Sequence, residues 1–285
     1  MVSPNDYNNN SRLLKLFTQE PNHHVPRRTQ NMSLTPPSTS PATEEQVRAA
    51  LRTKSWFGFD LDDTLHEFRA ASRAATTHCL ALVAQENPRL PLEALQARYQ
   101  DILRQGTSNA FVDGKTSHDY RRERFSATLD YFELSHELLD ELLTSYERVL
   151  VENLTLKPGA LSLLAAIKSS GGKIAVITEG PQDAQERALR DLGIAKYVDL
   201  LATTNRFGVS KTSGLFEKVL AHLSIQRHDI VYVGDSVERD IAPATAEGIF
   251  AIRLHDKAPF RLTLNPVVIN SLEVLEGLLM LPNQN

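Results

Sequence analysis

The chain has 285 residues, of which 41% are hydrophobic and 23% are charged, the balance of a globular protein with a buried core. Its formal net charge of −4 gives no electrostatic attraction for a nucleic acid polymer or an anionic membrane, so we expect neither as a partner. No apolar run approaches the roughly 20 residues that would cross a bilayer. Cys79 is the only cysteine, which leaves no intrachain disulfide and favours a reducing compartment.

Residues 1–43 are predicted to be a disordered N-terminal extension. They are polar, rich in Asn, Ser, Thr and Pro, and cannot bury enough apolar surface to offset the entropy of ordering. Residues 11–17 have a faint amphipathic pattern, but the acidic Asp6 and Glu20 flank them and argue against mitochondrial targeting. We therefore expect a cytoplasmic protein, with the nucleus as a further compartment.

The folded part is predicted to begin with a short helix over residues 43–52 and an apolar strand over residues 55–59 that stops at Asp60. Residues 66–153 then show helical periodicity without a convincing strand. In residues 136–150, leucines and other apolar residues recur at three- and four-residue spacing, and Ser135 is the predicted N-cap. We therefore predict that residues 66–153 form an inserted helical domain.

After the insert, strands and helices alternate. Strands are expected at residues 173–177, 198–202, 230–233, 249–254 and near 267, with helices at 158–171, 181–192, 215–223, up to 248 and up to 279. This alternation predicts right-handed βαβ units and a parallel sheet with helices on both faces. The expected fold class is therefore α/β, with a Rossmann-like core built from residues 44–65 and 154–285.

Polar residues fall where ligands bind in such sheets. Asp60 follows the first strand, Thr178 ends the second, Asp235 follows a later one, and Lys211 lies in a loop before a helix. The carboxyl ends of parallel strands share one edge of the sheet, and ligands bind there. These residues are therefore predicted to form one site.

Four segments in this order resemble the motifs of the haloacid dehalogenase-like superfamily. Asp60-Leu61-Asp62-Asp63-Thr64 is similar to its first motif, Asp-x-Asp-x-Thr, and residues 174–180 are similar to its second. Lys211 resembles the third, and residues 234–240 match the fourth, Gly-Asp-x-x-x-x-Asp. The position of the insert between the first and second motifs resembles the C1-type helical cap of subfamily I, in its phosphatase branch.

The resemblance implies a magnesium-dependent phosphatase that hydrolyses a small phosphate monoester through an aspartyl-phosphate. Asp60 would be the nucleophile and Asp62 the general acid and base. Mg²⁺, which prefers oxygen ligands, would be bound by Asp60, Asp62 and Asp235, with Asp240 orienting a bound water or the lysine. The residues expected to bind substrate phosphate are Thr178, Glu179, Gly180 and Lys211. The substrate is expected to be a nucleotide, as for a 5′-nucleotidase, a sugar phosphate or a phosphoglycolate type.

Two departures from the family pattern stand out. The second motif commonly contains Thr-Asn-Gly, whereas Glu179 stands here between Thr178 and Gly180. A carboxylate beside a phosphate site is unfavourable, so we expect Glu179 to face the insert or the leaving group. In the third motif, Thr212 replaces the proline that often follows the lysine.

The residues leave three other functions open: a phosphosugar mutase with the same catalytic set, a 2-haloacid dehalogenase, and a non-catalytic binding module. They also leave the insert's role undecided. The loop at 106–109 and the basic residues Arg121, Arg122 and Arg124 either contact the substrate or belong to a solvated helix face. His66, Phe68 and Arg69 either line the pocket or only begin the insert.

Overall fold

The computed structural model describes residues 42–106, 111–257, 262 and 265–280. The expectations for residues 1–41 lie outside the described residues. Thr43 belongs to the fold, because it caps helix α1 (Glu44–Arg52) in a capping box with Gln46. Within the described residues, no helix is both long and apolar enough to cross a membrane.

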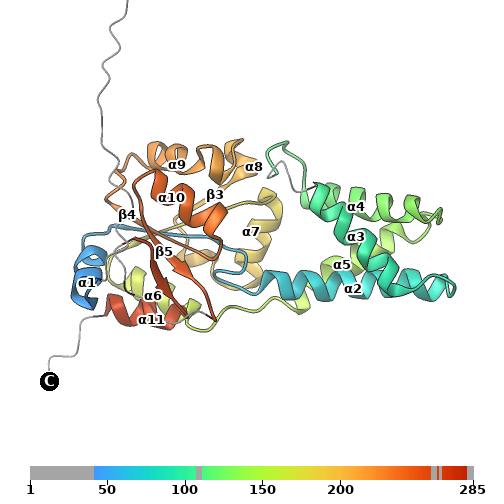
Figure 1. Ribbon diagram of the computed structural model, residues 1–285, viewed down its shortest axis with the longest axis horizontal. Coiled ribbons are helices and arrows are strands. Elements are labelled where there is room, and N and C mark those ends of the chain that lie inside the picture. The colour runs from blue at the N-terminus through green and yellow to red at the C-terminus, as the bar shows by residue number, and fades with distance from the viewer. Residues whose placement is uncertain (1–41, 107–110, 258–261, 263–264, 281–285) are drawn as a thin grey trace, which may run out of the picture. The chain divides into compact units, whose positions relative to one another are not determined.

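The core contains a parallel sheet of six strands in the order β3-β2-β1-β4-β5-β6. Figure 1 shows this sheet with helices packed around it. This is the doubly wound arrangement that the alternation of strands and helices predicts. Strand β3 starts two residues later and ends one residue later than expected. The strands are β1 (Trp56–Phe59), β2 (Lys173–Thr178), β3 (Leu200–Thr203), β4 (Ile230–Gly234), β5 (Phe250–Leu254) and β6 (Val267–Ile269).

Each central strand sends alternate side chains to opposite faces of the sheet. In β2, Ile174 and Val176 join the cluster that contains α1, α6 (Ala160–Ser169) and α11 (Leu272–Leu279). Ala175 and Ile177 join the cluster on the other face, with α9 (Leu215–Leu223) and α10 (Ala242–Ala246). Both faces are therefore buried, which accounts for the continuous apolar runs in the strands. α7 (Gln182–Asp191) packs on the first face.

Three short segments depart from regular helix. The single helix expected after Asp235 is broken into a π-type turn, η3 (Val237–Ile241), and α10. Two 3₁₀ turns also occur, η1 (Ala195–Tyr197) and η2 (Lys211–Ser213), together with a one-turn helix, α8 (Thr204–Phe207). η2 and η3 begin just beyond the sheet, where they position polar side chains.

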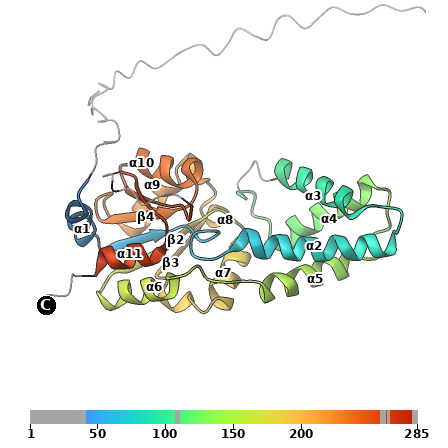
Figure 2. The same cartoon turned by 60° about the horizontal axis from the view of Figure 1, so that its bottom comes forward.

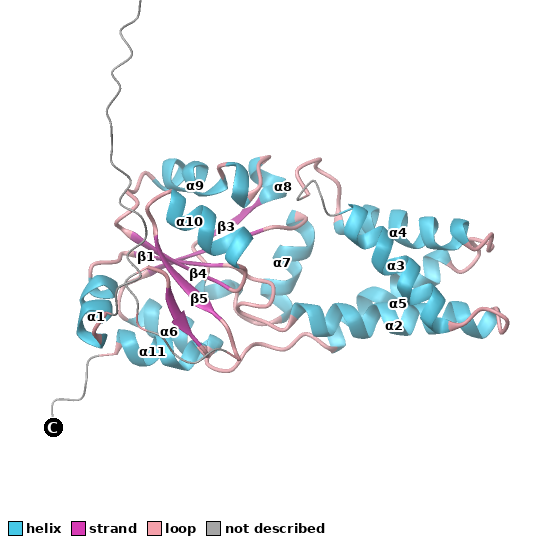
Figure 3. Ribbon diagram, viewed as in Figure 1, coloured by secondary structure: helices cyan, strands magenta, loops and turns pink. Residues whose placement is uncertain are grey.

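The segment between β1 and β2 is a helical insert, which Figure 3 shows as helices without strands. It has a hydrophobic core of its own, built from all four of its helices. The Ser135 N-cap prediction is wrong, because the last helix begins three residues later than expected, with Leu138 at the N-cap position. Ser135 instead accepts a hydrogen bond from the Glu137 amide in the preceding turn. The helices are α2 (Phe68–Glu86), α3 (Leu92–Gly106), α4 (Ser117–Tyr131) and α5 (Leu139–Glu152).

The two connections between core and insert lie side by side. The Glu67 amide donates to the Thr155 carbonyl at 2.9 Å, and the Lys157 amide donates to the Leu65 carbonyl at 2.9 Å. His66 forms an antiparallel bridge with Leu156 between them. Figure 2 shows both connections leaving the core next to each other. The chain therefore enters and leaves the insert at one place.

Candidate active site

The candidate site lies at the carboxyl ends of the two central strands. In this strand order the connections reverse direction between β1 and β4, which is where ligands bind in doubly wound sheets. Asp60 directly follows β1 and Asp235 directly follows β4. Carboxylate oxygens of Asp60, Asp235 and Asp240 all lie within 4.8 Å of one another. The structure therefore brings together the aspartates that the sequence placed in one site.

Lys211 lies between two of these carboxylates. Its Nζ is 2.6 Å from Asp60 Oδ1 and 2.5 Å from Asp240 Oδ1, and the residue is only 3% exposed. Burial opposes the charge on the amine, but Asp240 and Asp60 outweigh it and raise the pKa of Lys211. The lysine therefore stays protonated and supplies positive charge beside Asp60.

Asp60 is buried in a group with excess negative charge. Burial raises the pKa of this carboxyl to about 8, even though Lys211 acts in the opposite direction. Thr64 donates a hydrogen bond to its second oxygen, Oδ2, at 3.3 Å. Lys211 contacts two of the three clustered carboxylates, and together the three provide hard oxygen donors that fit a divalent cation such as Mg²⁺.

Asp240 is held by groups from three elements. Its Oδ1 lies 2.9 Å from the Tyr232 hydroxyl as well as near Lys211, and its Oδ2 accepts from the Ser236 amide at 3.0 Å. A Cβ at Gly234 would lie 2.5 Å from Asp240 Cβ and Cγ, so only glycine allows this approach. Tyr232 was not predicted as a site residue, because in the sequence it is only one residue of an apolar, buried strand.

Arg69, at the start of the insert, contacts the carboxylate cluster from outside. Its Nη2 lies 3.0 Å from Asp235 Oδ2 and its Nε lies 3.1 Å from Asp63 Oδ2. Burial opposes its charge, but Asp63 and Asp235 raise the pKa of Arg69. Of the two roles left open for this residue, the structure places it in the pocket wall.

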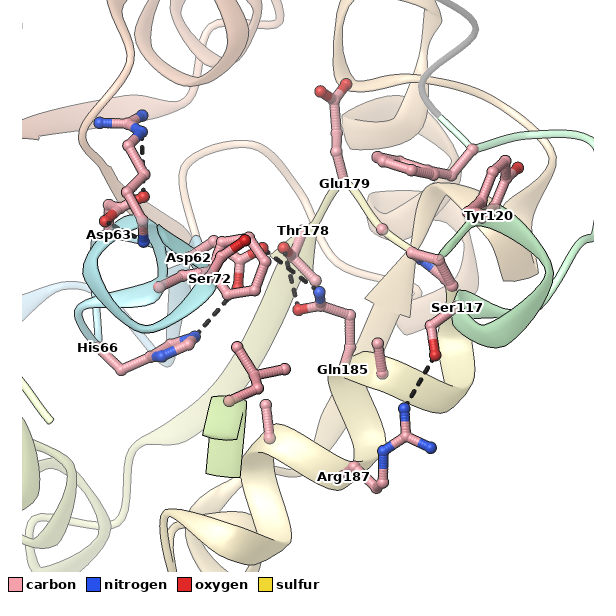
Figure 4. Close-up of a pocket in the computed structure, with 18 of the residues that line it drawn as sticks. Asp62, Asp63, His66, Ser72, Ser117, Tyr120, Thr178, Glu179, Gln185 and Arg187 are labelled. Atoms are coloured by element: carbon pink, nitrogen blue, oxygen red, sulfur yellow. Dashed lines mark hydrogen bonds and ion pairs between the residues drawn. The ribbon is translucent and has the colours of Figure 1, made fainter. Parts of the chain in front are cut away.

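Asp62 is oriented by two side chains, as Figure 4 shows. Its Oδ1 lies 3.0 Å from Nε2 of His66, which is fully buried, and its Oδ2 accepts from Gln185 Nε2 at 3.5 Å. Gln185 lies on α7 and was missed by the sequence analysis. The two contacts hold the Asp62 carboxyl toward the cavity.

The second motif surrounds Gln185. Thr178, at the end of β2, is buried and donates to Gln185 Oε1 at 3.5 Å. The Gly180 amide donates to Thr204 Oγ1 at 3.4 Å. A Cβ at Gly180 would lie 2.6 Å from Gln185 Nε2, so glycine makes room for this side chain.

Glu179 does not turn toward the insert. Its Oε1 accepts a hydrogen bond from the Lys211 backbone amide at 3.1 Å, and its Oε2 lies 3.9 Å from Arg239 Nη1. In Figure 4 its carboxylate points away from Asp62, His66 and Gln185. Of the two expected orientations, the one toward the insert is wrong, because two core groups bind its oxygens. Glu179 does line the cavity, and its orientation toward the leaving group stays a prediction. It stabilises the loop that carries Lys211.

Core and insert together line a cavity of about 520 Å³, which includes Asp60, Asp62, Thr178 and Lys211. This volume is in the range of small-molecule sites.

The three insert arginines differ in their partners and in their position relative to the cavity. Arg121 and Arg124 both line the cavity, but Arg121 pairs with Glu147. Arg122 is exposed and pairs with Asp140. Residues 107–109 of the predicted contact loop lie outside the described residues.

The insert is joined to α7 on one side of this cavity. Ser117, the first residue of α4, donates through its backbone amide and its hydroxyl to Asp183, at 2.9 and 2.6 Å. Arg187 Nη2 donates to the Ser117 hydroxyl at 2.9 Å, and its Nε lies 2.9 Å from Glu147 on α5. Figure 4 shows the Ser117–Arg187 contact between insert and core.

The doubly wound sheet and the aspartate and lysine cluster at its carboxyl edge define an α/β enzyme with an acidic active site. The chain belongs to the haloacid dehalogenase-like hydrolase family, whose model matches residues 55–248.

Known relatives cover most of the chain. It is 28% identical, over 69% of its length and 82% of the relative's, to a glyceraldehyde 3-phosphate phosphatase of Methanocaldococcus jannaschii. It is 29% identical to a ribulose-1,5-bisphosphate 5-phosphatase of Halopiger xanaduensis, over 67% of this chain and 80% of that protein. Among solved structures, the hydrolase YfnB of Bacillus subtilis, bound to magnesium, matches with a TM-score of 0.60 and 26% identity. That match covers 79% of this chain and 98% of YfnB.

Proposed function

We propose that this hydrolase is a magnesium-dependent phosphatase that cleaves a small-molecule phosphate monoester, with Asp60 as the nucleophile. The observation that carries the proposal is the contact of Lys211 Nζ with Asp60 Oδ1 at 2.6 Å within the carboxylate cluster. A buried carboxylate beside a fixed ammonium can accept a phosphoryl group whose negative charge the ammonium offsets. The phosphatase relatives support the same reaction class.

Asp60, the backbone carbonyl of Asp62, and Asp235 would hold Mg²⁺, with the Asp240 carboxylate in the same cluster. The ion would polarise a phosphoryl oxygen and favour the ionised form of Asp60. In the first step, Asp60 attacks phosphorus, the bond to the leaving oxygen breaks, and Asp62 gives that oxygen a proton. In the second step, a water gives Asp62 a proton and attacks the aspartyl-phosphate, which releases phosphate and restores Asp60.

The remaining residues position these groups. His66 and Gln185 hold the Asp62 carboxyl, while Thr178 and the amide of Gly180 would bind phosphoryl oxygens. Lys211 keeps its charge beside the transferring group, and Asp240 keeps Lys211 in place. Glu179 would act through the Lys211 loop rather than on the substrate.

The cavity between core and insert supports a small-molecule substrate, because its volume of about 520 Å³ is that of a small-molecule site and has no room for a folded protein. Nucleotides, sugar phosphates and phosphoglycolate remain the substrate types to test. A phosphosugar mutase would use the same residues. It would require a bisphosphate activator, which separates it from a hydrolase in a direct assay.

The test is phosphate release by the purified full chain from p-nitrophenyl phosphate and a panel of metabolite phosphates, with Mg²⁺ or with EDTA. We expect turnover that needs Mg²⁺ and falls at least about 10³-fold in Asp60→Asn. Asp130→Asn, the same chemical change at an exposed position on α4, is the matched control and should retain activity. A folded protein that releases phosphate from none of these compounds would contradict the proposal.

A further inference from the structure

We propose that Arg124 on α4 binds a second anionic group of the substrate, a carboxylate or a phosphate, at the insert side of the cavity. The inference rests on the proposed phosphatase function and specifies its substrate class. The substrate would be a phosphate monoester that carries another oxyanion away from the scissile bond.

Arg124 differs from its neighbours in charge pairing. Among the cationic side chains that line the cavity within the described residues, it alone forms no ion pair. Each of the others lies within 4.0 Å of a carboxylate oxygen: Arg69, Arg104, Arg121, Arg187, Lys211 and Arg239. Among these cavity-lining cations of the described residues, Arg124 is therefore the one whose charge is available to pair with a bound ligand.

The surroundings of Arg124 leave one of its guanidinium nitrogens, Nη2, without an acceptor. Its Nη2 atom is buried and has no hydrogen-bond partner. Its Cζ lies 6.0 Å from the centre of the Phe111 ring and 5.7 Å from that of the Tyr120 ring. These rings stabilise the charge through their faces but accept no strong hydrogen bond. A buried, unsatisfied guanidinium N–H is unfavourable, so this position favours a ligand that supplies oxygens.

A guanidinium offers parallel N–H donors that match the two oxygens of a carboxylate or phosphate. A neutral carbonyl or hydroxyl would accept a bond without compensating the charge. Asp60 and Arg124 line the same cavity, Asp60 from the core and Arg124 from the insert. One small molecule can therefore present a phosphate ester to Asp60 and an oxyanion to Arg124.

The test compares three substrates of the full chain with Mg²⁺: glycerol 2-phosphate, which has no second anion, 2-phosphoglycolate and fructose 1,6-bisphosphate. We expect Arg124→Gln to lower kcat/KM for at least one two-anion substrate by about 10- to 100-fold, mainly through KM. Turnover of glycerol 2-phosphate should change less than about threefold. The substrate with the larger loss identifies the second group as carboxylate or phosphate.

Two variants control for folding and for charge. Arg122→Gln removes an exposed arginine of the same helix that pairs with Asp140 outside the cavity, and should change none of the three rates. Arg124→Lys keeps the charge without the paired donors and should give an intermediate loss. Thermal midpoints of all variants show whether any loss comes from unfolding.

Binding to the Asp60→Asn protein, measured by calorimetry with the same three compounds, separates this inference from the proposed function. Absence of turnover, together with two-anion binding that weakens at least about tenfold in Asp60→Asn/Arg124→Gln, would refute the phosphatase and support the Arg124 site. Turnover without preference for either two-anion substrate, or an equal effect of Arg124→Gln on all three, would overturn the Arg124 site and leave the phosphatase standing.

Discussion

Ser117 and Asp183 connect the insert to the core by two hydrogen bonds, since the backbone amide and the hydroxyl of Ser117 both donate to the Asp183 carboxylate. The contact satisfies an amide in the first turn of α4, where backbone donors lack partners in the helix. Burial acts to raise the pKa of Asp183, but the bonds from Ser117 and the charge of Arg187 outweigh it and lower that pKa. The carboxylate is therefore ionised at neutral pH, and the contact weakens only in acid.

Asp183→Ala should loosen the insert without unfolding either part. We expect faster amide hydrogen exchange in the first turn of α4, because Ser117 loses both acceptors. Exchange in α2, which forms its own packing contacts with α5 and does not bond to Asp183, should not change. Glu186→Gln, a neighbouring carboxylate of α7 that contacts Gln182, is the control. Unchanged exchange in α4 of Asp183→Ala would contradict a role for this contact.

Lys211→Met should destabilise the metal-free protein strongly. It leaves Asp60 and Asp240 buried without their counter-charge, and breaking a buried pair costs about 3–5 kcal/mol. The free energy of unfolding in urea at pH 7 measures this loss. Lys218→Met, on the exposed side of α9, should change it by less than about 0.5 kcal/mol. A loss in Lys211→Met no larger than in this control would show that the cluster is not desolvated as described.

Gly234→Ala should disturb Asp240. The new Cβ would lie 2.5 Å from two atoms of the Asp240 side chain, so the turn after β4 must shift. We expect a loss of about 1–3 kcal/mol in unfolding free energy, together with lower activity. Gly277→Ala is the matched control, because nothing lies within 4 Å of its Cβ in α11. There alanine should stabilise by about 0.5–1 kcal/mol.

Mg²⁺ should raise the thermal midpoint of the protein, because an ion that binds only the folded state stabilises it by mass action. At 100 times the dissociation constant the gain is about 2.7 kcal/mol. Asp235→Asn removes one carboxylate of the cluster and should abolish most of the shift. NaCl at equal ionic strength controls for screening. An equal Mg²⁺ shift in Asp235→Asn would place the ion elsewhere.

Cys79 should be unreactive in the folded protein. Burial in the insert raises the pKa of its thiol to about 12, and its Sγ donates to the Leu142 carbonyl at 3.3 Å. We expect no reaction with a disulfide reagent at pH 8 until denaturant is added, when one thiol appears.

The same shift gives a pH dependence. The unfolded thiol ionises near pH 8.5 while the folded thiol keeps its proton, so stability falls as pH rises from about 8.5 toward 12. Cys79→Ala removes this component, so its unfolding free energy should decline less than that of the wild type between pH 8 and 10. Identical slopes in the two proteins would contradict the shift.

Much of the fold could be predicted because apolar periodicity and glycine positions mark its elements. Asp60 and Asp235 end apolar runs, and parallel strands bring such ends together. Side-chain partners were harder to predict. Gln185 is one polar residue of an amphipathic helix, and its contact with Asp62 depends on the space that Gly180 leaves. Nothing in the sequence marks that space.

The insert shows the same limit. The sequence alone does not distinguish the three arginines of residues 121–124. In the structure Arg121 pairs with Glu147 inside the insert, Arg122 faces solvent, and only Arg124 lines the cavity without an ion pair. Glu179 was expected to face the insert or the leaving group, because a carboxylate repels phosphate. In the structure its carboxylate instead accepts a hydrogen bond from the Lys211 amide and lies near Arg239. These residues follow Glu179 by 32 and 60 positions in the sequence.

The bridge between His66 and Leu156 holds together the two connections to the insert, so the insert can change without a change in the core. Because the chain leaves and re-enters the core at hydrogen-bonded neighbours, the intervening helices can lengthen, shorten or be replaced with little cost in closing the loop. The strands and their register need not respond. Substitutions that alter substrate recognition can therefore accumulate in the helices of the insert while the residues at the edge of the sheet stay the same. Closely similar cores can in this way act on chemically different substrates.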